Sequence, residues 1–492
     1  MTPWVVRAGI ALLPFSAVAA CSNHPTASAP PAEQPFITDD AGGAIILRGV
    51  NVMNATKSDP NRLAEIGPDD ANRIANDWGM NFVRLLILWD ALEPTEGTFS
   101  SSYLDGVQAR VDLLAKAGIH VMLDMHQDVY AAEFCCDGAP AWAIDDDDAG
   151  FTLQSNWGLN YLQPAVVHAF DNFWAADGAH PELQKNYAAA WRAVAARFAG
   201  YPGVLGYDLM NEPFPGSDFD AFEAISRLEA PDGGTSHLFD DQKLGPFYQT
   251  VIDSIRQVDP DGWIFLEPRY AAPANGSPSY LPKLDDPRAG PPRLASAPHL
   301  YSSAASIQNQ YTTDDMTVPS WEAARTAEQA AWPAPLLMGE WGTAFSMQGA
   351  TQYADDILAM ADRMRASWAY WSYDPGAAGS WGLFDPTTLA DNPAVSIVIR
   401  PYPRRVAGYP ESWSFDTASG QFDLVFASRA GVTGATDLFI PASIQYPNGW
   451  TASLVGEASS AWTSAWSAAT SVLSITTDPA TAEHNVRVTA GH

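Results

Sequence analysis

Two glutamates, Glu212 and Glu340, combine the residue type and surroundings that cleavage of a glycosidic bond requires. Each ends a short apolar run, and Asn211 directly precedes the first of them. Glycoside hydrolysis uses two carboxyl groups, one protonated to donate to the leaving oxygen and one ionised to face the sugar carbon. Two carboxylates held about 5 Å apart cannot both ionise cheaply, so one keeps a raised pKa and acts as the acid. Tyr301 can hydrogen-bond the nucleophile, and Asn211 can hold a sugar 2-hydroxyl.

Other apolar runs carry polar or aromatic side chains at or near their ends. These are Asn51, Asn54, Lys57, Arg84, His126, Gln127, Asp128, Glu267, Arg269, His299 and Trp371. For any one of them a structural role is the simpler interpretation, because a strand-end Asn or Glu often caps the next helix and a Trp often covers a rim. A whole set at one face of a protein favours an active site. We interpret Glu267 as structural or peripheral, because no Asn precedes it.

The elements that must position these residues alternate in type between residues 36 and 399. Helical period is clear in Tyr103–Ala117, which Gly118 closes as a cap, and in Tyr187–Phe198. Eight apolar, β-branched runs are predicted as strands buried on both faces. They are Ile45–Asn51, Asn81–Leu88, His120–His126, Val204–Glu212, Trp263–Glu267, Leu294–Tyr301, Pro335–Glu340 and Ser367–Tyr373. This alternation predicts an α/β fold, a (β/α)8 TIM barrel over residues 36–399, whose strand C-termini line the active face.

The pattern changes near Arg400. Short alternating stretches follow, separated by Gly, Pro, Ser and Asn, and helical period is absent. The stretches are Phe422–Ala427, Asp437–Ile440, Ala452–Val455, Ser471–Thr476 and Asn485–Thr489. They predict a C-terminal β-sandwich over residues 400–492.

The N-terminus is typical of an export signal. Ala8 to Ala20 is apolar apart from Ser16, and a run of about a dozen residues is too short to span a bilayer. The ending Val18-Ala19-Ala20-Cys21 resembles a bacterial lipobox, in which the cysteine is lipidated; ordinary cleavage after Ala20 is the alternative. We expect a signal and lipobox segment at residues 1–21 and a Pro/Ala/Ser-rich linker at 22–35. The protein is then exported, and either secreted or anchored to the bacterial cell membrane through Cys21.

Composition narrows the classes of partner. The chain has 26 basic and 57 acidic residues, a formal net charge of −31, which disfavours nucleic acids and anionic membranes. Apolar residues make up 47%, enough for a packed core, so global disorder is excluded. Beyond Cys21 the cysteines are the adjacent Cys135 and Cys136, which form neither a disulfide framework nor a zinc pattern. A vicinal disulfide and two free thiols are both compatible with the sequence.

One set of motifs is shared with a known enzyme family. It consists of Leu209–Pro213, Arg84, the pair His299 and Tyr301, Gly339 with Glu340, and Trp371. Together these resemble glycoside hydrolase family 5, a retaining family of clan A. Longer runs are similar to bacterial endoglycoceramidases, and the resemblance extends from about residue 36 to the C-terminus. The runs are Asn81–Arg84, Val121–Tyr130, Gly138–Ala143, Ala169–Trp174, Tyr207–Phe214, Asp285–Gly290 and a linker at Pro401–Arg404.

The resemblance implies residue roles. Glu212 would be the acid/base, Glu340 the nucleophile and Tyr301 its hydrogen-bonding partner, and Trp157 would support a more distal sugar. The other expected substrate-binding residues are Lys57, Arg84, His126, Asp128, Asn211, His299 and Trp371. Two departures bear on pocket shape, namely Cys135-Cys136 in the loop after the third strand and Trp341 where Phe is usual.

The implied function is hydrolysis of the bond between glycan and ceramide of glycosphingolipids, through a covalent glycosyl-enzyme and without metal or cofactor. A membrane or micelle surface would supply the substrate, and we expect a monomer. The long segment Gln127–Pro181 is rich in large apolar residues, as a site for a lipid-linked sugar requires. Alternatives are another family 5 enzyme (an endogalactosylceramidase, a glucosylceramidase or a polysaccharide endoglucanase) or a non-catalytic glycolipid-binding lipoprotein. The last would be expected to lack a catalytic carboxylate, and both are present.

Overall fold

The computed structural model describes residues 35–53, 56–175, 178, 180–226, 236–374, 381–385 and 387–491. The expected signal segment with Cys21, residues 22–34 of the expected linker and Asn54 lie outside these residues. Within the described part of the chain, no helix is long and apolar enough to cross a membrane.

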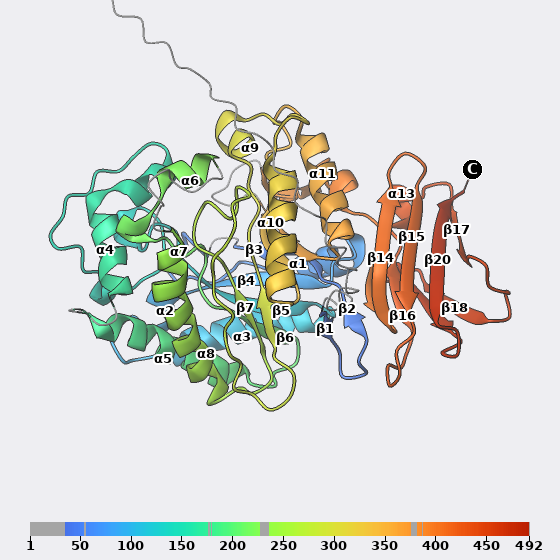
Figure 1. Ribbon diagram of the computed structural model, residues 1–492, viewed down its shortest axis with the longest axis horizontal. Coiled ribbons are helices and arrows are strands. Elements are labelled where there is room, and N and C mark those ends of the chain that lie inside the picture. The colour runs from blue at the N-terminus through green and yellow to red at the C-terminus, as the bar shows by residue number, and fades with distance from the viewer. Residues whose placement is uncertain are drawn as a thin grey trace, which may run out of the picture. The chain divides into compact units, whose positions relative to one another are not determined.

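Eight parallel strands form one sheet in the order β8-β7-β6-β5-β4-β3-β10-β9 (Figure 1). The strands are β3 (Arg48–Val52), β4 (Phe82–Leu88), β5 (His120–His126), β6 (Val204–Asp208), β7 (Trp263–Leu266), β8 (Leu294–Ser296), β9 (Leu337–Trp341) and β10 (Ser367–Tyr370). Parallel bridges Ser296↔Leu336 and Leu300↔Trp341 join the two edges, so the sheet closes on itself. The predicted (β/α)8 barrel is confirmed.

The strands form because their sequences are apolar on both faces. Every residue of β4 is buried, and a separate cluster that includes Phe82, Met122, Phe265 and Leu337 fills the barrel interior. Three strands end at least three residues earlier than predicted, β6 at Asp208, β8 at Ser296 and β10 at Tyr370. The chain that follows β6 has left the strand conformation by Glu212, which adopts a φ of 42°.

Helices surround the barrel strands (Figure 1). The helix α3 begins after Ser100, whose hydroxyl accepts from Tyr103 N, and the chain turns after it at Gly118 with a φ of 77°. The helices over residues 35–374 are α1 (Pro68–Asn72), α2 (Trp89–Leu92), α3 (Ser101–Lys116), α4 (Pro164–Trp174), α5 (Pro181–Phe198), α6 (Ala221–Ser226), α7 (Ser236–Phe239), α8 (Gly245–Arg256), α9 (Ser303–Gln308), α10 (Thr317–Ala331) and α11 (Ala350–Arg363). After the barrel come the strand pair β11 (Phe384–Asp385) and β12 (Ala390–Asp391) and the short helix α12 (Val395–Val398).

The C-terminal region consists of two antiparallel sheets, which confirms the predicted β-sandwich. One has the order β1-β2-β13-β16-β19-β18 and the other β14-β15-β20-β17. Their strands are β1 (Ile37–Thr38), β2 (Ala44–Ile45), β13 (Tyr402–Val406), β14 (Tyr409–Asp416), β15 (Gln421–Ala427), β16 (Thr436–Phe439), β17 (Trp450–Leu454), β18 (Trp462–Ser467), β19 (Val472–Thr477) and β20 (Glu483–Ala490), with α13 (Ala442–Gln445) between β16 and β17.

Five of these ten strands, β1, β2, β13, β14 and β18, were not predicted as part of the sandwich. Pro401–Arg404, expected to be a linker, instead runs into β13, which pairs with β16 and β2. The hairpin β1–β2 belongs to this sheet, although the sequence analysis grouped residues from 36 onward with the barrel. Strands of two residues carry no period, and their pairing partner lies far away in the sequence.

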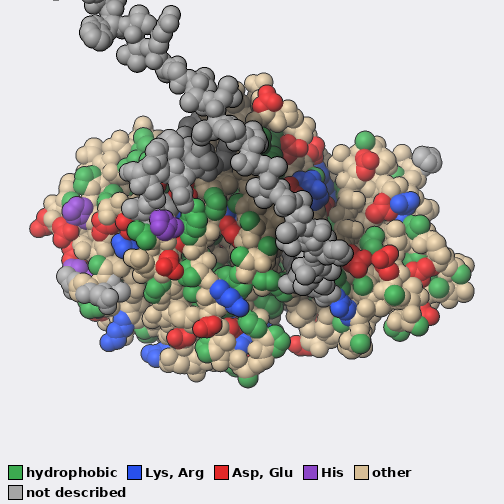
Figure 2. Space-filling view, viewed as in Figure 1, with side chains coloured by type: hydrophobic (Ala, Val, Ile, Leu, Met, Phe, Trp, Pro, Cys, Tyr) green, Lys and Arg blue, Asp and Glu red, His purple; other side chains and the backbone are tan. Residues whose placement is uncertain are grey.

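Specific hydrogen bonds join the barrel and the sandwich. Asp362 on α11 accepts from Trp413 Nε1 on β14 at 2.7 Å and from Arg48 Nη2 on β3 at 2.9 Å. Acidic side chains are spread over both regions on the face shown in Figure 2, as the net charge leads one to expect.

Candidate active site

The two glutamates predicted to be catalytic meet at the carboxyl ends of the barrel strands. Glu212 follows β6 and Glu340 lies in β9, and His299, after β8, lies between them. Its Nδ1 is 2.9 Å from Glu212 Oε1 and 3.6 Å from Glu340 Oε2. The facing oxygens of the two carboxylates lie within 4.8 Å of each other. This separation leaves no room for a water between them and is typical of retaining glycosidases.

Glu212 has the surroundings of an acid. Burial raises the pKa of its carboxyl group, and the nearby Glu340 and Glu267 raise it further, while His299 opposes the shift. Its backbone has a φ of 42°, which is strained for a residue with a side chain. Glu267 Oε2 accepts from Glu212 N at 2.9 Å, and Gln127 Nε2 donates to Glu212 O at 3.1 Å, so both backbone polar groups of Glu212 are hydrogen-bonded.

Glu340 has the surroundings of an anion. Arg84 Nη1 donates to Oε1 at 2.7 Å and the Tyr301 hydroxyl donates to Oε2 at 2.8 Å. Burial and the carboxylates of Glu340 and Glu212 raise the pKa of Tyr301 well above its usual value, so the phenol keeps its proton and acts as a donor. The two donors fix the direction of the carboxylate and place positive charge beside it.

Arg84 lies beneath the site rather than in it. We expected it to contact substrate, but it is fully buried, and Nε, Nη1 and Nη2 all bond to protein groups. These groups belong to Asn51, Asp124, Asp208, Asn211, Glu267 and Glu340. Arg84 is the third residue of β4, not its end, so it reaches the layer below the catalytic carboxylates.

His299 is the second expected substrate-binding residue whose side chain faces protein groups. It is buried, and besides its contact with Glu212 its Nε2 lies 3.2 Å from Glu267 Oε1. Burial alone would lower the pKa of this imidazole, but Glu267 and Glu340 raise it well above its usual value. The ring therefore lies among three carboxylates, with Nδ1 facing Glu212 and Glu340 and Nε2 facing Glu267.

Glu267 has the structural role that we considered for it, but it lies at the centre of the site and not at its periphery. Its Oε1 accepts from Arg84 Nη2 at 2.7 Å, in addition to its bond to Glu212 N. Burial raises the pKa of Glu267, but His299 and Arg84 outweigh this effect and lower it overall. Glu267 is thus an anion that links the acid, the guanidinium and the imidazolium.

The side chains expected to contact the nearer sugar form a second group beside this one. Lys57 forms an ion pair with Asp128, and its Nζ lies 4.9 Å from the centre of the Trp371 ring. His126 stacks on Trp371 with ring centres 5.7 Å apart. Although burial and Lys57 lower the pKa of His126, Asp124, 2.7 Å from Nδ1, raises it to about 9. The structure therefore brings four predicted residues together.

Asn211 and Trp157 differ in their freedom. Asn211 is buried, and its amide is oriented by Arg84 Nη2 at 3.0 Å and by Gln127 O at 3.0 Å. Trp157 begins a 3₁₀ helix, η4 (Trp157–Leu162), and half of its surface is exposed. An exposed indole at the edge of a polar site offers a flat apolar face to a sugar ring.

Several residues that build the site were not predicted from the sequence. Asp124, Asp137 and Asp208 are buried, and Asp124 and Asp208 contact the groups named above. Asp124 and Asp208 lie within β5 and β6, strands that are otherwise mainly apolar. A charged residue inside a buried strand was the available signal, because such a charge requires a partner.

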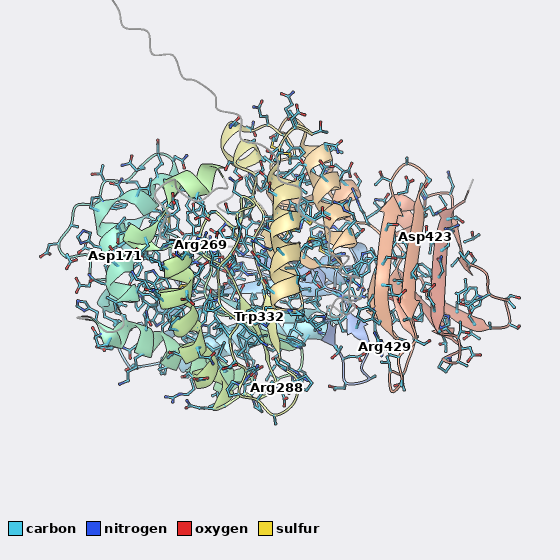
Figure 3. All side chains as sticks on the ribbon, viewed as in Figure 1. Asp171, Arg269, Arg288, Trp332, Asp423 and Arg429 are labelled. Carbon is cyan, nitrogen blue, oxygen red and sulfur yellow. A yellow bond between two sulfur atoms is a disulfide. The ribbon has the colours of Figure 1, made fainter. Side chains whose placement is uncertain are left out.

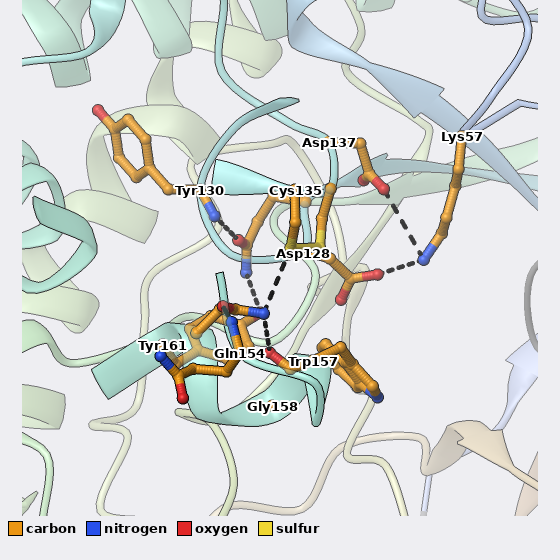
Figure 4. The surroundings of a disulfide bond; sticks show 12 residues. Lys57, Asp128, Tyr130, Cys135, Asp137, Gln154, Trp157, Gly158 and Tyr161 are labelled. Atoms are coloured by element: carbon orange, nitrogen blue, oxygen red, sulfur yellow. Dashed lines mark hydrogen bonds and ion pairs between the residues drawn. A yellow bond between two sulfur atoms is a disulfide. The ribbon is translucent and has the colours of Figure 1, made fainter. Parts of the chain in front are cut away.

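Cys135 and Cys136 form a vicinal disulfide, which decides between the two states that the sequence left open. It lies in the loop after β5, near Asp128, Asp137 and Trp157 (Figure 4). Three groups of His, Asp and Glu side chains, centred on Asp128, on Glu340 and on Asp208, are close enough to ligate a metal. Lys57 or Arg84 contacts a carboxylate in each group, so a protein cation already competes for the place of a metal ion.

Comparison with known proteins identifies the family. Residues 40–377 match the profile "Cellulase (glycosyl hydrolase family 5)", and residues 400–489 match the glycoside hydrolase family 5 C-terminal domain. The chain belongs to glycoside hydrolase family 5.

Relatives within the family share most of the chain. Endoglycoceramidase I of Rhodococcus hoagii is 28% identical over 440 residues, which cover 86% of this chain and 82% of that protein. Endo-glycoceramidase II from Rhodococcus sp. in complex with ganglioside GM3 is 35% identical, with a TM-score of 0.82 over 93% of this chain and 100% of that one. Its lactosyl-enzyme intermediate matches with 36% identity and a TM-score of 0.81 over the same shares.

Proposed function

We propose that this protein is a retaining endo-β-glycosidase that hydrolyses the bond between glycan and ceramide in glycosphingolipids. The observation that carries the reaction type is the pair Glu212 and Glu340, with oxygens within 4.8 Å and with unlike surroundings. The similarity to endoglycoceramidases over most of the chain supports the substrate, as does the solved complex of one of them with ganglioside GM3.

In the first step, the Glu340 carboxylate attacks the anomeric carbon while Glu212 donates its proton to the ceramide oxygen. The bond between the anomeric carbon and that oxygen breaks, ceramide leaves as an alcohol, and the glycan is covalently bound to Glu340. Tyr301 and Arg84 hold the nucleophile, and the raised pKa of Glu212 keeps the proton available.

In the second step, the Glu212 carboxylate takes a proton from water, which attacks the same carbon from the face that ceramide vacated. The bond to Glu340 breaks, and the glycan leaves with its original β configuration. Because His299 contacts Glu212 directly, its positive charge stabilises the anionic form of Glu212 that this step requires.

The proximal sugar would bind among Lys57, His126, Asp128, Asn211 and Trp371, with Trp157 beneath a more distal sugar. This is supported by the contacts among Lys57, His126, Asp128 and Trp371, and by the bond that holds Asn211, the residue before Glu212, to Arg84. Asp128 and Lys57 are partly exposed and supply an acceptor and a donor for hydroxyl groups.

The segment after β5 supports a lipid-linked substrate. Of its large apolar residues, Phe134 and Tyr161 are buried in the segment itself. The exposed ones are Leu153, Trp157, Leu159 and Leu162, and their exposed fractions range from 48% to 64%. Leu159 and Leu162 are three residues apart on a 3₁₀ helix, so they share one face. We infer that this face meets ceramide or the membrane or micelle that carries it.

Incubation with a panel of glycosphingolipids, followed by analysis of both products, tests the proposal. We expect intact oligosaccharide and free ceramide. Release of single sugars from the non-reducing end, with the glycan–ceramide bond intact, would contradict it. Activity on β-glucans alone would favour an endoglucanase, and activity on glucosylceramide alone a glucosylceramidase. The reaction should proceed in the presence of a chelator, because no step requires a metal.

We propose further that the protein is exported as a monomer and anchored through a lipid on Cys21, as the lipobox-like ending at Cys21 indicates. The Cys21→Ala variant should then move from the membrane fraction to the soluble fraction. An unmodified mature N-terminus in the wild type would contradict lipidation. The sedimentation coefficient of the purified chain would test the monomer.

A further inference from the structure

We propose that the Cys135–Cys136 disulfide is a positioning element that holds Trp157 in place for the distal sugar. This inference rests on the proposed function, since it assigns a determinant of the glycan site described above. The disulfide would act on substrate binding and not on the chemical steps.

The base of the loop that carries the disulfide is fixed without it. Asp128 N donates to Asp137 O at 3.1 Å and Asp137 N donates to Asp128 O at 3.2 Å. Ala139 N donates to Tyr130 O at 2.7 Å just beyond this pair. The loop is therefore closed by backbone hydrogen bonds at its base, and the disulfide directly precedes Asp137 on the returning arm of the loop.

A disulfide between neighbours contributes little to global stability. Cross-links stabilise mainly by restricting the unfolded chain, and the effect grows with the number of residues enclosed. Cys135 and Cys136 are adjacent, so their bond encloses no longer segment of chain. Its consequence is local: the small ring restricts the peptide between the two residues and fixes where each sulfur lies.

The fixed sulfur contacts the residue that organises η4. Asn160 Nδ2 donates to Cys135 Sγ at 3.6 Å and to Trp157 O at 2.9 Å (Figure 4). Asn160 Oδ1 accepts from Gln154 N at 2.8 Å. Asn160 is fully buried, whereas Trp157 is half exposed. One amide thus ties the disulfide to the backbone of the exposed indole.

The indole has few other constraints. Its ring centre lies 6.1 Å from that of Tyr161, which stacks on Tyr270 at 4.6 Å. Gly158 N donates to Asn156 Oδ1 at 3.1 Å and fixes the first turn of η4. Reduction would free the Cys135–Cys136 peptide and move Sγ, which removes one of the contacts of Asn160 and loosens the Trp157 backbone.

The test compares two aryl β-glycosides, a glucoside that fills only the proximal site and a lactoside that also reaches the distal one. Wild-type enzyme is assayed before and after treatment with a phosphine reductant, with free thiols counted. The Cys135→Ser/Cys136→Ser variant is the matched control, because it lacks the Cys135–Cys136 disulfide that the reductant would break.

We expect reduction to raise KM for the lactoside about 10-fold and to leave its kcat within about 2-fold. Both constants for the glucoside should stay within about 2-fold, and the double serine variant should behave as reduced wild type with or without reductant. In a Trp157→Ala background, reduction should change the lactoside KM by less than about 2-fold, because the two changes act through the same contact.

Unchanged lactoside kinetics after complete reduction would overturn the inference. An equal loss on both substrates, or an undiminished effect of reduction in the Trp157→Ala background, would overturn it as well. Calorimetric binding of a disaccharide-type and a monosaccharide-type iminosugar gives the same comparison without turnover. Failure of hydrolysis alone would therefore contradict the proposed function and leave the inference to be decided by binding.

Discussion

The mouth of the barrel and the C-terminal sandwich solve the problem of burial in opposite ways. In the sandwich, β15 alternates strictly, with Phe422, Leu424 and Phe426 buried. Asp423, between them, points outward and pairs with Arg487 at 2.6 Å (Figure 3). This alternation places apolar side chains in the core and charged side chains at the surface of the same strand.

The barrel mouth instead buries charge. Arg84 is surrounded by Asp124, Asp208, Glu267 and Glu340, and the acid Glu212 occupies a strained backbone conformation. Burial and Glu267 raise the pKa of Asp208 well above its usual value, although Arg84 opposes the shift. Such an arrangement costs stability, which indicates that the site is arranged for catalysis rather than for folding.

The largest expected effect comes from Glu340→Gln. Without the nucleophile no glycosyl-enzyme forms, so kcat/KM should fall at least about 10³-fold on every substrate. Steady-state assays with a glycolipid and an aryl glycoside would measure the loss. A pre-steady-state burst of aryl alcohol in this variant would show that the roles of the two glutamates are reversed.

Glu212→Gln should lower activity on glycosphingolipids by about 10²–10⁴-fold but spare the first step on an activated aryl glycoside. Such a leaving group needs no proton, so the glycosyl-enzyme accumulates. Azide, which needs no base, should restore turnover and give a β-glycosyl azide; an α-azide from this variant would indicate that Glu212 is the nucleophile and that the two roles are reversed. In the wild type, kcat/KM on the lipid should decline as pH rises through the raised pKa of Glu212, and this decline should weaken on the activated glycoside.

Glu267→Gln should lower kcat by about 10–100-fold with little change in KM, because small displacements of catalytic groups have effects of this size. The amide oxygen can still accept at one of the two positions, but the NH₂ group then faces either the Glu212 N–H or both Arg84 and His299. Kinetics on lipid and aryl substrates would show the split between kcat and KM. A rise in KM alone would indicate that Glu267 contacts the sugar instead.

Leu424→Ala should reduce the free energy of unfolding by about 2–5 kcal/mol and leave kcat/KM of the folded enzyme unchanged. Leu424 is an apolar residue that is fully buried in the sandwich, whereas the catalytic carboxylates lie in the barrel. Urea unfolding and assays at a temperature where the variant stays folded would test this. A loss of kcat/KM in the folded variant would mean that the two regions are coupled.

Asp137→Asn should have the smallest effect and the opposite sign, raising stability at neutral pH. Burial raises the pKa of Asp137 to about 6, and neither carboxylate oxygen accepts a hydrogen bond. With the folded pKa above the unfolded value, the ionised side chain disfavours the folded state by about 1–3 kcal/mol above pH 6, and the effect vanishes below about pH 4. Unfolding of both proteins at about pH 4 and pH 7.5 measures it. An equal difference at the two pH values would contradict titration of Asp137 as the cause.

The sequence alone determined the architecture and the reacting pair. Continuous apolar runs identified all eight barrel strands. Strands that are buried on both faces carry apolar residues at nearly every position, so each of them stands out as an unbroken apolar run. Alternation of apolar and polar residues identified five sandwich strands, because these strands bury one face and expose the other. Glu212 and Glu340 were found because barrel chemistry gathers at strand ends, which are visible as the points where an apolar run stops.

The tertiary structure decided depth, pairing and partnership. Arg84 and His299 were correctly singled out but are buried against protein groups, since exposure depends on the register of neighbouring strands and not on position in a run. Glu267 looked peripheral until its two oxygens were seen between Glu212 and Arg84. The hairpin β1–β2 and β13 pair across more than three hundred residues, and the tie between Cys135 and Trp157 passes through a single buried amide. Such contacts join separate segments of the chain, and neither segment's local sequence indicates its partner. Only the folded structure shows them.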